Sequence, residues 1–555
     1  MTFGLVEPDL VLEPDAENGE VFTQRWVVNL ILDLCGYTTD QDLGALQVVE
    51  PACGGGAFLG AIVDRLVESC EHTGRDLADT SDAIHAFDLL SENVATTRQL
   101  VSRRLEAHGV ERATARDLAN AWVRQGDFLL TDHSATEADF VIGNPPYIRL
   151  ENLSPERNAA YRQACPTMRG RSDIFVGFIE LGLRILRPGG VLGFIVADRW
   201  MRNQYGASLR ELVASEFSVE AVIEMHDVEA FEEEVSAYPA ITVIRRSEQD
   251  KVLVASTTKE FGASSATDLR DWAMHPPNGA LQTSSVNAAW LPQWFAGQES
   301  WPWGTPEHLA LLADLEERLP PLQDSETGTR VGIGLATGAD DVYLTNDPNL
   351  VETERLLPFV MAGDLTEGNI RWSGTYLVNP WDDNGLVDLD EWPRLRSYLE
   401  SHGDQVRARH TARKTPSRWH KTIDRMTPGL LERPKLLLPE MKASAHPVLD
   451  EGNYYPHHNL YHITSTEWDL EVLGGLMLSD LTNLFVGAYC VKMRGGCYRF
   501  QAQYLRRVRV PPINSIGDAD RKALALAFQE RDVEAATATA LRLCGISDLP
   551  RFANP

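Results

Sequence analysis

The segment Asn144-Pro145-Pro146-Tyr147 follows the apolar run 139–143 and carries the groups needed to hold an aromatic amine. Such an amine is a poor nucleophile because its lone pair is delocalised into the ring. The side-chain oxygen of Asn144 and the carbonyl oxygen of Pro145 can each accept a hydrogen bond from an NH2 group. The two prolines fix φ and hold that carbonyl in place, and Tyr147 offers a face for stacking a planar substrate. These residue types predict group transfer to an exocyclic amine; the alternative is a Pro-Pro turn that only ends a strand.

A glycine-rich segment, EPACGGGAFL over residues 50–59, lies between an expected strand and an expected helix. Glycines let the backbone turn sharply and approach a ligand closely. The pattern runs from Glu50 through Ala52 and Gly54 to Gly56 and differs from the dinucleotide pattern GxGxxG. The spacing E-x-x-x-G-x-G is typical of enzymes that bind S-adenosylmethionine (AdoMet), which has no pyrophosphate. A glycine-rich turn in any doubly wound domain is the alternative.

Two carboxylates and one hydroxyl extend the AdoMet interpretation. Asp88 ends the apolar run 84–88, and a carboxylate at the C-terminal edge of a strand can accept two hydrogen bonds from ribose hydroxyls. Asp127 ends the next unit, where it can accept from the exocyclic amine of the cofactor's adenine. Thr23 precedes an apolar helix and suits either an N-cap or a ligand of the methionine carboxylate. Each residue alone is equally well explained as a polar loop residue, but the ordered series favours AdoMet.

The elements that must position these residues follow an α/β pattern. Residues 47–250 alternate short apolar runs with amphipathic stretches, which indicates a parallel sheet with helices on its faces. Strands are expected at 47–50, 84–88, 139–144 and 191–197, and helices at 57–70, 91–108 and 173–187. Residues 221–226 and 240–246 form a further strand pair that can close the sheet as a hairpin.

The rest of the chain differs from residues 47–250 in its hydrophobic pattern and composition. Residues 251–330 are weakly periodic, short β-like runs begin at Val331, and residues 518–544 are rich in Ala and Leu at helical spacing. We therefore expect a catalytic domain over residues 1–250, a connecting region over 251–330, a separate mixed α+β domain over 331–510 and a helical tail over 511–555.

The combined motifs resemble the γ-class N6-adenine DNA methyltransferases of the TaqI type and their larger relatives in restriction–modification and phage-defence systems. The matching segments occur in the γ order, from Phe22-Thr23 to NPPY. The resemblance implies a doubly wound, mostly parallel seven-stranded AdoMet-dependent methyltransferase sheet and methylation of a flipped adenine at N6. It implies AdoMet contacts from Thr23, Glu50, Ala52, Gly54, Gly56, Asp88, Asp127 and Asn144, and adenine contacts from Asn144, Pro145, Pro146 and Tyr147. Gln24 departs from the family, which usually has proline there.

The same resemblance assigns a role to Phe231, the aromatic residue ahead of the closing hairpin. A base taken out of the stack needs a hydrophobic slot, and Phe231 with Tyr147 could form its two walls. A core phenylalanine at a loop end is the alternative. The run Glu232-Glu233-Glu234 follows, where the family usually has basic residues. Carboxylates there predict weak DNA binding that a partner, such as a nuclease or another defence-system subunit, supplements.

The formal net charge of −29 argues against a protein that coats nucleic acid, because Lys and Arg supply most DNA affinity. Residues 401–450 nevertheless contain ten Lys and Arg against five acidic residues. With the segments 331–343 and 495–512 on either side, they resemble the family's target-recognition region. We expect double-stranded DNA to contact Arg407, Arg413, Lys414, Lys421 and Lys442, in a stretch that also holds Arg409, Arg418, Lys435, Trp419 and His420. A solvated charged face is the alternative.

Several classes are disfavoured. The seven cysteines show no CxxC pair, which predicts a reduced cytoplasmic protein without a metal site. The acidic residues 1–20 do not form a signal peptide, and no apolar run of about 18 residues predicts a membrane span. No nuclease motif or P-loop is found in the sequence, so another chain would have to cut DNA. Methylation of RNA or of a protein amide, and an inactive methyltransferase-like DNA-binding subunit, remain as alternative functions.

Overall fold

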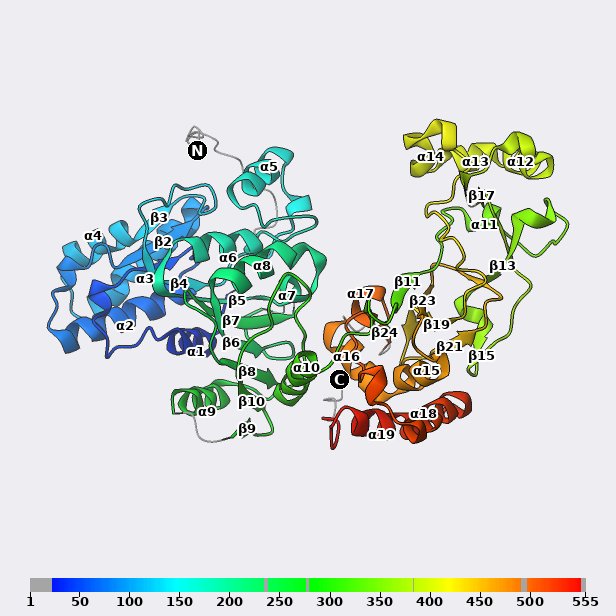
Figure 1. The fold of residues 1–555 in the computed structure, drawn as a ribbon. Helices are drawn as coiled ribbons and strands as arrows, with labels where there is room; N and C mark the ends of the chain where they lie inside the picture. The colour runs from blue at the N-terminus through cyan, green and yellow to red at the C-terminus, as the bar shows by residue number, and fades with distance from the viewer. Residues whose placement is uncertain (1–21, 234–237, 276–278, 383, 491–496, 551–555) are drawn as a thin grey trace. The chain divides into compact units, whose positions relative to one another are not determined.

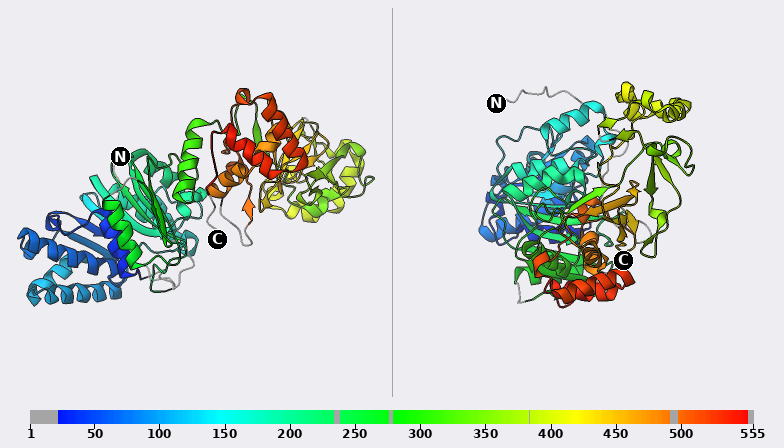
Figure 2. Two further views of the ribbon diagram at one scale, coloured as in Figure 1. Left: turned by 90° about the horizontal axis from the view of Figure 1, so that it is seen from below. Right: turned by 45° about the vertical axis from the view of Figure 1, so that its right-hand side comes forward.

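The computed structural model describes residues 22–233, 238–275, 279–382, 384–490 and 497–550. Contacts divide the chain between Ala310 and Leu311 into two compact units, and the ribbons in Figure 1 and Figure 2 show the elements of each. The acidic N-terminal segment 1–20, Glu234 and the glycine pair 495–496, which the sequence analysis considered, lie outside the described residues.

The first unit is built on one large sheet. Its ten strands in the described residues follow the order β3-β2-β1-β4-β5-β7-β6-β8-β10-β9. They are β1 Val48–Glu50, β2 Ile84–Asp88, β3 Val123–Gln125, β4 Ala138–Gly143, β5 Leu186–Ala197, β6 Ser218–Glu224, β7 Pro239–Arg245, β8 Val252–Thr257, β9 Leu281–Gln282 and β10 Val286–Leu291. Strands β1 to β5 run parallel, and β7 is antiparallel to both β5 and β6. The expected doubly wound sheet and its closing hairpin are confirmed.

The sheet extends beyond the seven strands that we expected, because the expected connecting region 251–330 contributes strands β8, β9 and β10 to it. β8 pairs in parallel with β6, and β10 pairs antiparallel with β8. The first four residues of β8 are all buried. A strand buried on both faces has no polar–apolar alternation, so periodicity could not distinguish it from an irregular apolar segment.

Helices cover both faces of this sheet (Figure 1). They are α1 Arg25–Cys35, α2 Ala57–Thr73, α3 Ser91–Ala107, α4 Arg112–Trp122, α5 Pro155–Ala164, α6 Phe175–Arg184, α7 Arg199–Arg202, α8 Ala207–Glu216 and α9 Ala263–Met274, while α10 (Pro306–Arg318) crosses the boundary between the units. Neighbouring strand residues point to opposite faces, so Val48 and Val49 belong to different apolar clusters. One cluster includes side chains of α1, α2 and α9, and the other includes those of α6 and α8.

Helix α1 lies directly against β5, and this contact fixes the start of the described chain. A Cβ atom built on Gly193 of β5 would lie 2.1 Å from Sγ of Cys35 and 3.1 Å from Ile31. Only glycine therefore permits this approach. Because α1 follows Phe22–Gln24 immediately, its packing also determines where those residues lie.

The second unit combines small sheets with helices. Its strands are β11 Arg330–Ile333, β12 Leu344–Thr345, β13 Leu356–Val360, β14 Leu365–Thr366, β15 Asn369–Ile370, β16 Tyr376–Val378, β17 Trp381–Asp382, β18 Gly385–Leu386, β19 Lys435–Pro439, β20 Met441–Lys442, β21 Val448–Asp450, β22 Tyr455–Pro456, β23 Leu460–Thr464 and β24 Tyr498–Arg499. Its helices are α11 Asp340–Tyr343, α12 Pro393–Ser401, α13 Gly403–Ala408, α14 His410–Lys414, α15 Leu470–Leu478, α16 Asp480–Tyr489, α17 Ala502–Leu505, α18 Asp518–Glu530 and α19 Val533–Leu543.

The expected helical tail is not separate from this unit. Helix α18 packs against α15 so closely that a Cβ atom on Gly475 would lie 2.4 Å from the carbonyl oxygen of Leu524. Within the described chain, no single helix is long and apolar enough to cross a bilayer; α15 and α16 reach that length and composition only as a pair bent by 64°.

The contact between α1 and β5 gives a test of the fold. We expect Gly193→Ala to lower the free energy of unfolding by about 1–3 kcal/mol, because the added methyl group overlaps Cys35. Combining it with Cys35→Ala should restore part of the loss, which denaturant titration of the double-mutant cycle measures. Gly363→Ala is the control, since its Cβ atom would meet nothing within 4 Å. Additive effects of Gly193→Ala and Cys35→Ala would contradict this packing.

Candidate active site

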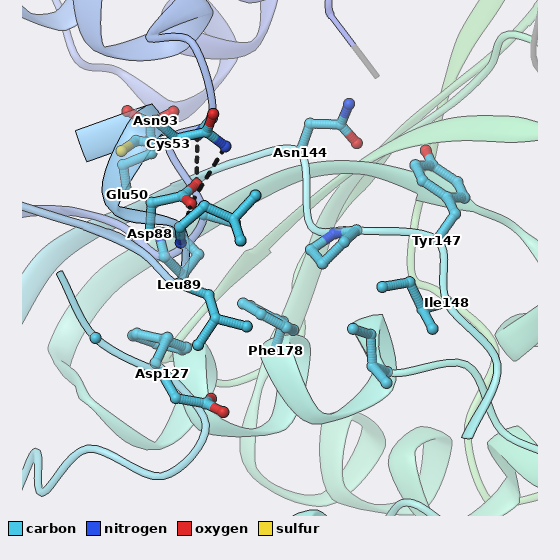
Figure 3. A pocket seen from close by; sticks show the side chains of 18 of the residues that line it. Glu50, Cys53, Asp88, Leu89, Asn93, Asp127, Asn144, Tyr147, Ile148 and Phe178 are labelled. Atoms are coloured by element: carbon cyan, nitrogen blue, oxygen red, sulfur yellow. Dashed lines mark hydrogen bonds between the residues drawn. The ribbon is translucent and has the colours of Figure 1, made fainter. Parts of the chain in front are cut away.

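A cavity of about 580 Å³ opens at the C-terminal edge of the parallel strands, where ligands bind in open α/β sheets (Figure 3). Of the residues predicted from sequence, those that line it are Thr23, Glu50, Ala52, Gly54, Asp88, Asp127, Asn144, Pro146 and Tyr147. Gly56, Pro145 and Phe231 do not line it. Figure 3 shows the carboxylates of Glu50 and Asp88 on one side of the cavity and Asn144 with Tyr147 on the other.

The glycine-rich loop after β1 needs its glycines for two reasons. Gly54 and Gly56 have φ values of 47° and 89°, which favour glycine, and Gly56 ends the turn directly before α2. Gly55 leaves room for the ring of Phe22, which would have to shift if a Cβ atom were added there, 2.7 Å away. The loop is tied to β2 by the Gly54 N–H, which donates to Asp88 at 2.9 Å.

Glu50 is a buried carboxylate and Asp88, its neighbour, is a partly buried one. Burial raises the pKa of Glu50 well above its usual range, and the charge of Asp88 raises it further. Among the described residues, Oε2 of Glu50 has no hydrogen-bond partner, although Glu50 is only 1% exposed. A buried acceptor without a partner at the cavity suits a donor on a ligand, and a cationic amine would also favour the charged carboxylate.

Asp88 accepts more hydrogen bonds from the protein than we expected. It accepts from the N–H groups of Gly54 and Leu90 and from Asn93, so three of its roughly four acceptor sites are used. One further donor can bind without displacing a partner, rather than two. Burial raises the pKa of Asp88, while these three hydrogen bonds lower it.

Asp127 has a partner that the sequence did not reveal. Tyr161 of α5 donates its hydroxyl to Oδ2 of Asp127 at 2.7 Å, and Leu129 N–H donates to Oδ1 at 3.1 Å. Burial raises the pKa of Asp127, and the Tyr161 hydrogen bond and the positive charge of Arg157 lower it. Ser154 and Pro155 give the sequence signals of a helix start, but no local pattern indicates that this helix faces Asp127.

The amide of Asn144 is held by Thr23. Nδ2 of Asn144 donates to Oγ1 of Thr23 at 3.2 Å, so the Thr23 hydroxyl contacts the NPPY segment and is not only an N-cap or a ligand group. On the same side of the cavity, the hydroxyl of Tyr147 donates to the carbonyl of Ile195 at 3.3 Å. This bond anchors the far end of the Tyr147 ring.

Phe231 and Tyr147 are neighbours, as expected, but their rings are not parallel. The centroids lie 6.4 Å apart and the planes cross at 82°. An edge-to-face pair does not form a slot with a π-face on each side. A base between them would require one of the rings to turn.

The basic residues of the second unit separate into two groups. Arg407 is exposed and lies over the ring of Trp419 at 3.9 Å, and Arg413, Lys414 and Lys442 are also exposed. Lys421 is partly buried and donates to Thr415.

Two other basic residues of this stretch have internal roles. Arg409 donates to the carbonyls of Thr337, Trp419 and Lys421. Lys435 is fully buried and pairs with Asp450 at 2.6 Å. These two residues of the basic stretch, which were not among the expected DNA contacts, therefore stabilise the second unit from within.

One group in the described part of the chain has side chains that could hold a metal ion, namely Asp340, His457 and His458. Nε2 of His457 lies 3.1 Å from Asp340, and Nδ1 accepts from Asn459 N–H at 3.4 Å. A histidine that accepts at Nδ1 carries its proton on Nε2, which is the nitrogen nearest Asp340. A structural hydrogen bond therefore explains this arrangement.

Comparisons of this chain with known proteins all find methyltransferases or enzymes of restriction–modification systems. The family model of the Eco57I restriction-modification methylases matches residues 74–231. The Type II methyltransferase M.PaeR7I of Pseudomonas aeruginosa is 42% identical over 96% of this chain and 93% of its own length, and M.XhoI of Xanthomonas vasicola is 41% identical over 97% and 99%. A solved structure of the Type IIL restriction-modification enzyme MmeI with DNA is similar in fold, with a TM-score of 0.52 at 13% identity, over 95% of this chain and 74% of that one.

The contact between Tyr161 and Asp127 generates a pH prediction. A ligand amine that needs the Asp127 carboxylate binds above the pKa of Asp127 and is lost as the pH falls through it. Removing the hydroxyl in Tyr161→Phe raises that pKa, so the loss of AdoMet affinity on acidification should begin at a higher pH in the variant than in the wild type. Calorimetric titration of AdoMet across pH measures this shift.

Tyr398→Phe is the matched control for this measurement. It removes a phenol-to-carbonyl hydrogen bond of 2.7 Å, to Val342, inside the second unit. Identical pH profiles for wild type and Tyr161→Phe would contradict the role of Tyr161.

Proposed function

Because the chain belongs to the Type II methyltransferases of restriction–modification systems and is a DNA methyltransferase, we propose that it transfers a methyl group from AdoMet to N6 of an adenine held outside the duplex. The observation that carries the proposal is the position of Asn144. It follows β4, beside β1, so that its amide faces the same cavity as Glu50 and Asp88.

AdoMet fits the residues of that cavity. The unpartnered Oε2 of Glu50 suits the amino group of the methionine end, and the remaining acceptor site of Asp88 suits a ribose hydroxyl. The acceptor capacity left on Asp127 suits the exocyclic amine of the cofactor's adenine. When bound, AdoMet supplies a methyl group on a sulfonium, which a neutral amine can attack.

The NPPY segment would hold the target adenine. Asn144 and the Pro145 carbonyl would accept the two hydrogens of the N6 amine and localise its lone pair on nitrogen. Tyr147 would stack on the base, with its hydroxyl fixed by Ile195. The partly buried position of both side chains limits water at the amine, which strengthens these hydrogen bonds. No strong base is required before transfer, because the attacking amine is neutral.

The second unit would recognise the DNA. Its exposed basic side chains, Arg407, Arg413, Lys414 and Lys442, suit phosphate contacts, and the guanidinium of Arg407 is already oriented by Trp419. The net charge of −29 opposes DNA binding by the rest of the surface. We therefore propose that the isolated chain binds DNA weakly at physiological salt and that a partner subunit, such as a nuclease, strengthens it.

Two variants separate catalysis from cofactor binding. Asn144→Ala should reduce N6-methyladenine formation by at least about a hundredfold, as expected on losing a group that acts on the nucleophile, while AdoMet affinity changes little. Asp88→Ala should weaken AdoMet binding first, because Asp88 also holds the Gly54 loop. Calorimetry with AdoMet and mass spectrometry of DNA nucleosides measure the two effects. Loss of AdoMet affinity in a folded Asn144→Ala variant would count against the assignment.

The same assay decides between substrates. Labelled AdoMet incubated with DNA, RNA and protein pools should label DNA, at adenine N6. Label in RNA or in protein amides, or none in any pool, would favour the alternative functions.

The DNA surface can be tested by charge reversal. Arg413→Glu with Lys414→Glu should weaken DNA binding by more than tenfold and lower the salt dependence, since each phosphate contact contributes to the slope. AdoMet binding should not change. Arg112→Glu with Lys522→Glu is the matched control, because it changes the charge equally at exposed positions on α4 and α18. Equal effects of both pairs would refute a local DNA surface, and robust methylation at physiological salt by the chain alone would refute the need for a partner.

A further inference from the structure

Residues 22–24, here named the strap, contact both sides of the active-site cavity. The ring of Phe22 packs on the glycine-rich loop, where a Cβ atom on Gly55 would lie 2.7 Å away. The Thr23 hydroxyl accepts from the amide of Asn144 at 3.2 Å. One short segment thus connects the loop proposed to bind AdoMet with the amide proposed to bind the target adenine.

The strap also holds the segment that carries Phe231. Thr23 and Phe231 form an antiparallel bridge, flanked by a hydrogen bond from Gln24 N–H to the Ala230 carbonyl and one from Glu232 N–H to the Phe22 carbonyl, each 2.9 Å. In this pairing the two residues directly opposite each other exchange no hydrogen bonds, and their side chains lie close together on one face. The backbone of the strap therefore sets the position of the Phe231 ring beside Tyr147.

The strap is fixed at its C-terminal end. It leads directly into α1, whose residues Val27, Val28 and Ile31 are fully buried against the sheet. Phe22 itself is 38% exposed. The strap is linked to the segment 230–232 by the bridge and by Nε2 of Gln24, which donates to the Phe231 carbonyl at 3.4 Å. The strap contacts the glycine-rich loop through Phe22 and Asn144 through Thr23. A ligand that orders the loop therefore also restricts the motion of the strap, and through it the motion of Asn144.

We propose that the strap couples cofactor binding to base binding, with Thr23 as the positioning residue for Asn144 and the backbone of Gln24 as the positioning group for Phe231. This inference rests on the proposed function. Ligand contacts that order Phe22 and the glycine-rich loop also order Thr23, which holds the Asn144 amide, and Gln24, whose backbone N–H holds the segment that carries Phe231 beside Tyr147. By linkage, the base raises the affinity for the cofactor by the same factor.

A purely structural strap predicts a different result. Breaking it would then lower stability and weaken each ligand separately, but it would leave unchanged the factor by which one ligand tightens the other. The coupling factor is therefore the discriminating quantity. It is the dissociation constant of DNA without a cofactor analogue divided by that with a saturating analogue.

The hydrogen bond from Gln24 N–H to the Ala230 carbonyl can be removed with little change to the backbone. The Gln24 φ of −55° is already that of proline, and Thr23 in the bridge has the extended conformation that precedes proline. Gln24→Pro thus removes the N–H that bonds to Ala230 without requiring a new backbone conformation. Gln24→Ala is its matched control, because it keeps the N–H and loses only the side chain, whose Nε2 donates to the Phe231 carbonyl at 3.4 Å and is lost in both variants.

The hydrogen bond between Thr23 and Asn144 can be removed independently by a second substitution. Thr23→Val removes the acceptor for Asn144 at nearly constant volume, and Thr23→Ser should restore it. Thr267→Val is the control for a threonine elsewhere, since Thr267 is exposed on α9 and bonds only to its own helix.

The measurement uses a duplex that the wild type methylates, with 2-aminopurine at the target position, and sinefungin as the unreactive cofactor analogue. We expect a coupling factor of about tenfold in the wild type, within the usual range for linked sites. Gln24→Pro and Thr23→Val should reduce it below about threefold, whereas Gln24→Ala, Thr23→Ser and Thr267→Val should keep it within about twofold of the wild type. The 2-aminopurine fluorescence should follow the same order, because it reports the unstacked base.

A coupling factor of one in the wild type, or equal factors in the wild type and in folded Gln24→Pro, would overturn the inference. Thermal melting identifies variants that fail to fold, and the two substitutions are independent of each other. Failure of the proposed function is distinguishable, because the wild type would then form no N6-methyladenine in DNA. A wild type that methylates adenine without coupling refutes the strap alone.

Discussion

Parallel pairing of β1 with β2 on one side and β4 on the other is the constraint on which the site depends. In this register Val48 lies opposite both Ile84 and Phe140. Three segments that are far apart in the chain therefore end at one edge of the sheet, and each ends in a polar residue of the cavity: Glu50, Asp88 or Asn144. A slip of one residue in either pairing would turn a strand's side chains to the opposite face.

Burial at that edge gives the carboxylates their chemistry. Glu50 and Asp88 both have raised pKa values, chiefly because little water reaches them. The charge of Asp88 disfavours the anion of Glu50, whose Oε2 has no hydrogen-bond donor among the described residues, and an amine on a ligand would relieve this. Asp127 is partly buried and has the Tyr161 hydroxyl as a hydrogen-bond donor from within the protein. The three carboxylates therefore need different donors from a ligand, and this difference favours one orientation of the ligand in the cavity.

Three exposed basic residues of the second unit lie close together in the chain. Arg407, Arg413 and Lys414 lie on neighbouring short helices, α13 and α14, and are exposed. Arg409, in the same stretch, holds the backbone at Thr337 and Lys421 and so supports the shape of this segment from within. Local charge and local rigidity are thus supplied by different arginines of one segment.

Local sequence determined the parts of the site that depend on residue type and on neighbours in the chain. The glycines of the loop, the turn at NPPY and the acids at strand ends are predictable because φ, chain reversal and strand burial act over a few residues. Parallel strands after short apolar runs then place these residues at one edge without further information.

Only the tertiary structure decided the contacts that join distant segments. Tyr161 on Asp127, Thr23 on Asn144, the bridge from the strap to Phe231, and the added strands β8, β9 and β10 leave no periodic signal in the sequence. The same holds for Lys435, which a charge count assigns to the surface and Asp450 holds in the core. Thr23 and Asn144 are 121 positions apart, and which hydroxyl meets which amide at such a separation depends on how whole elements pack. No rule based on neighbouring residues contains that information.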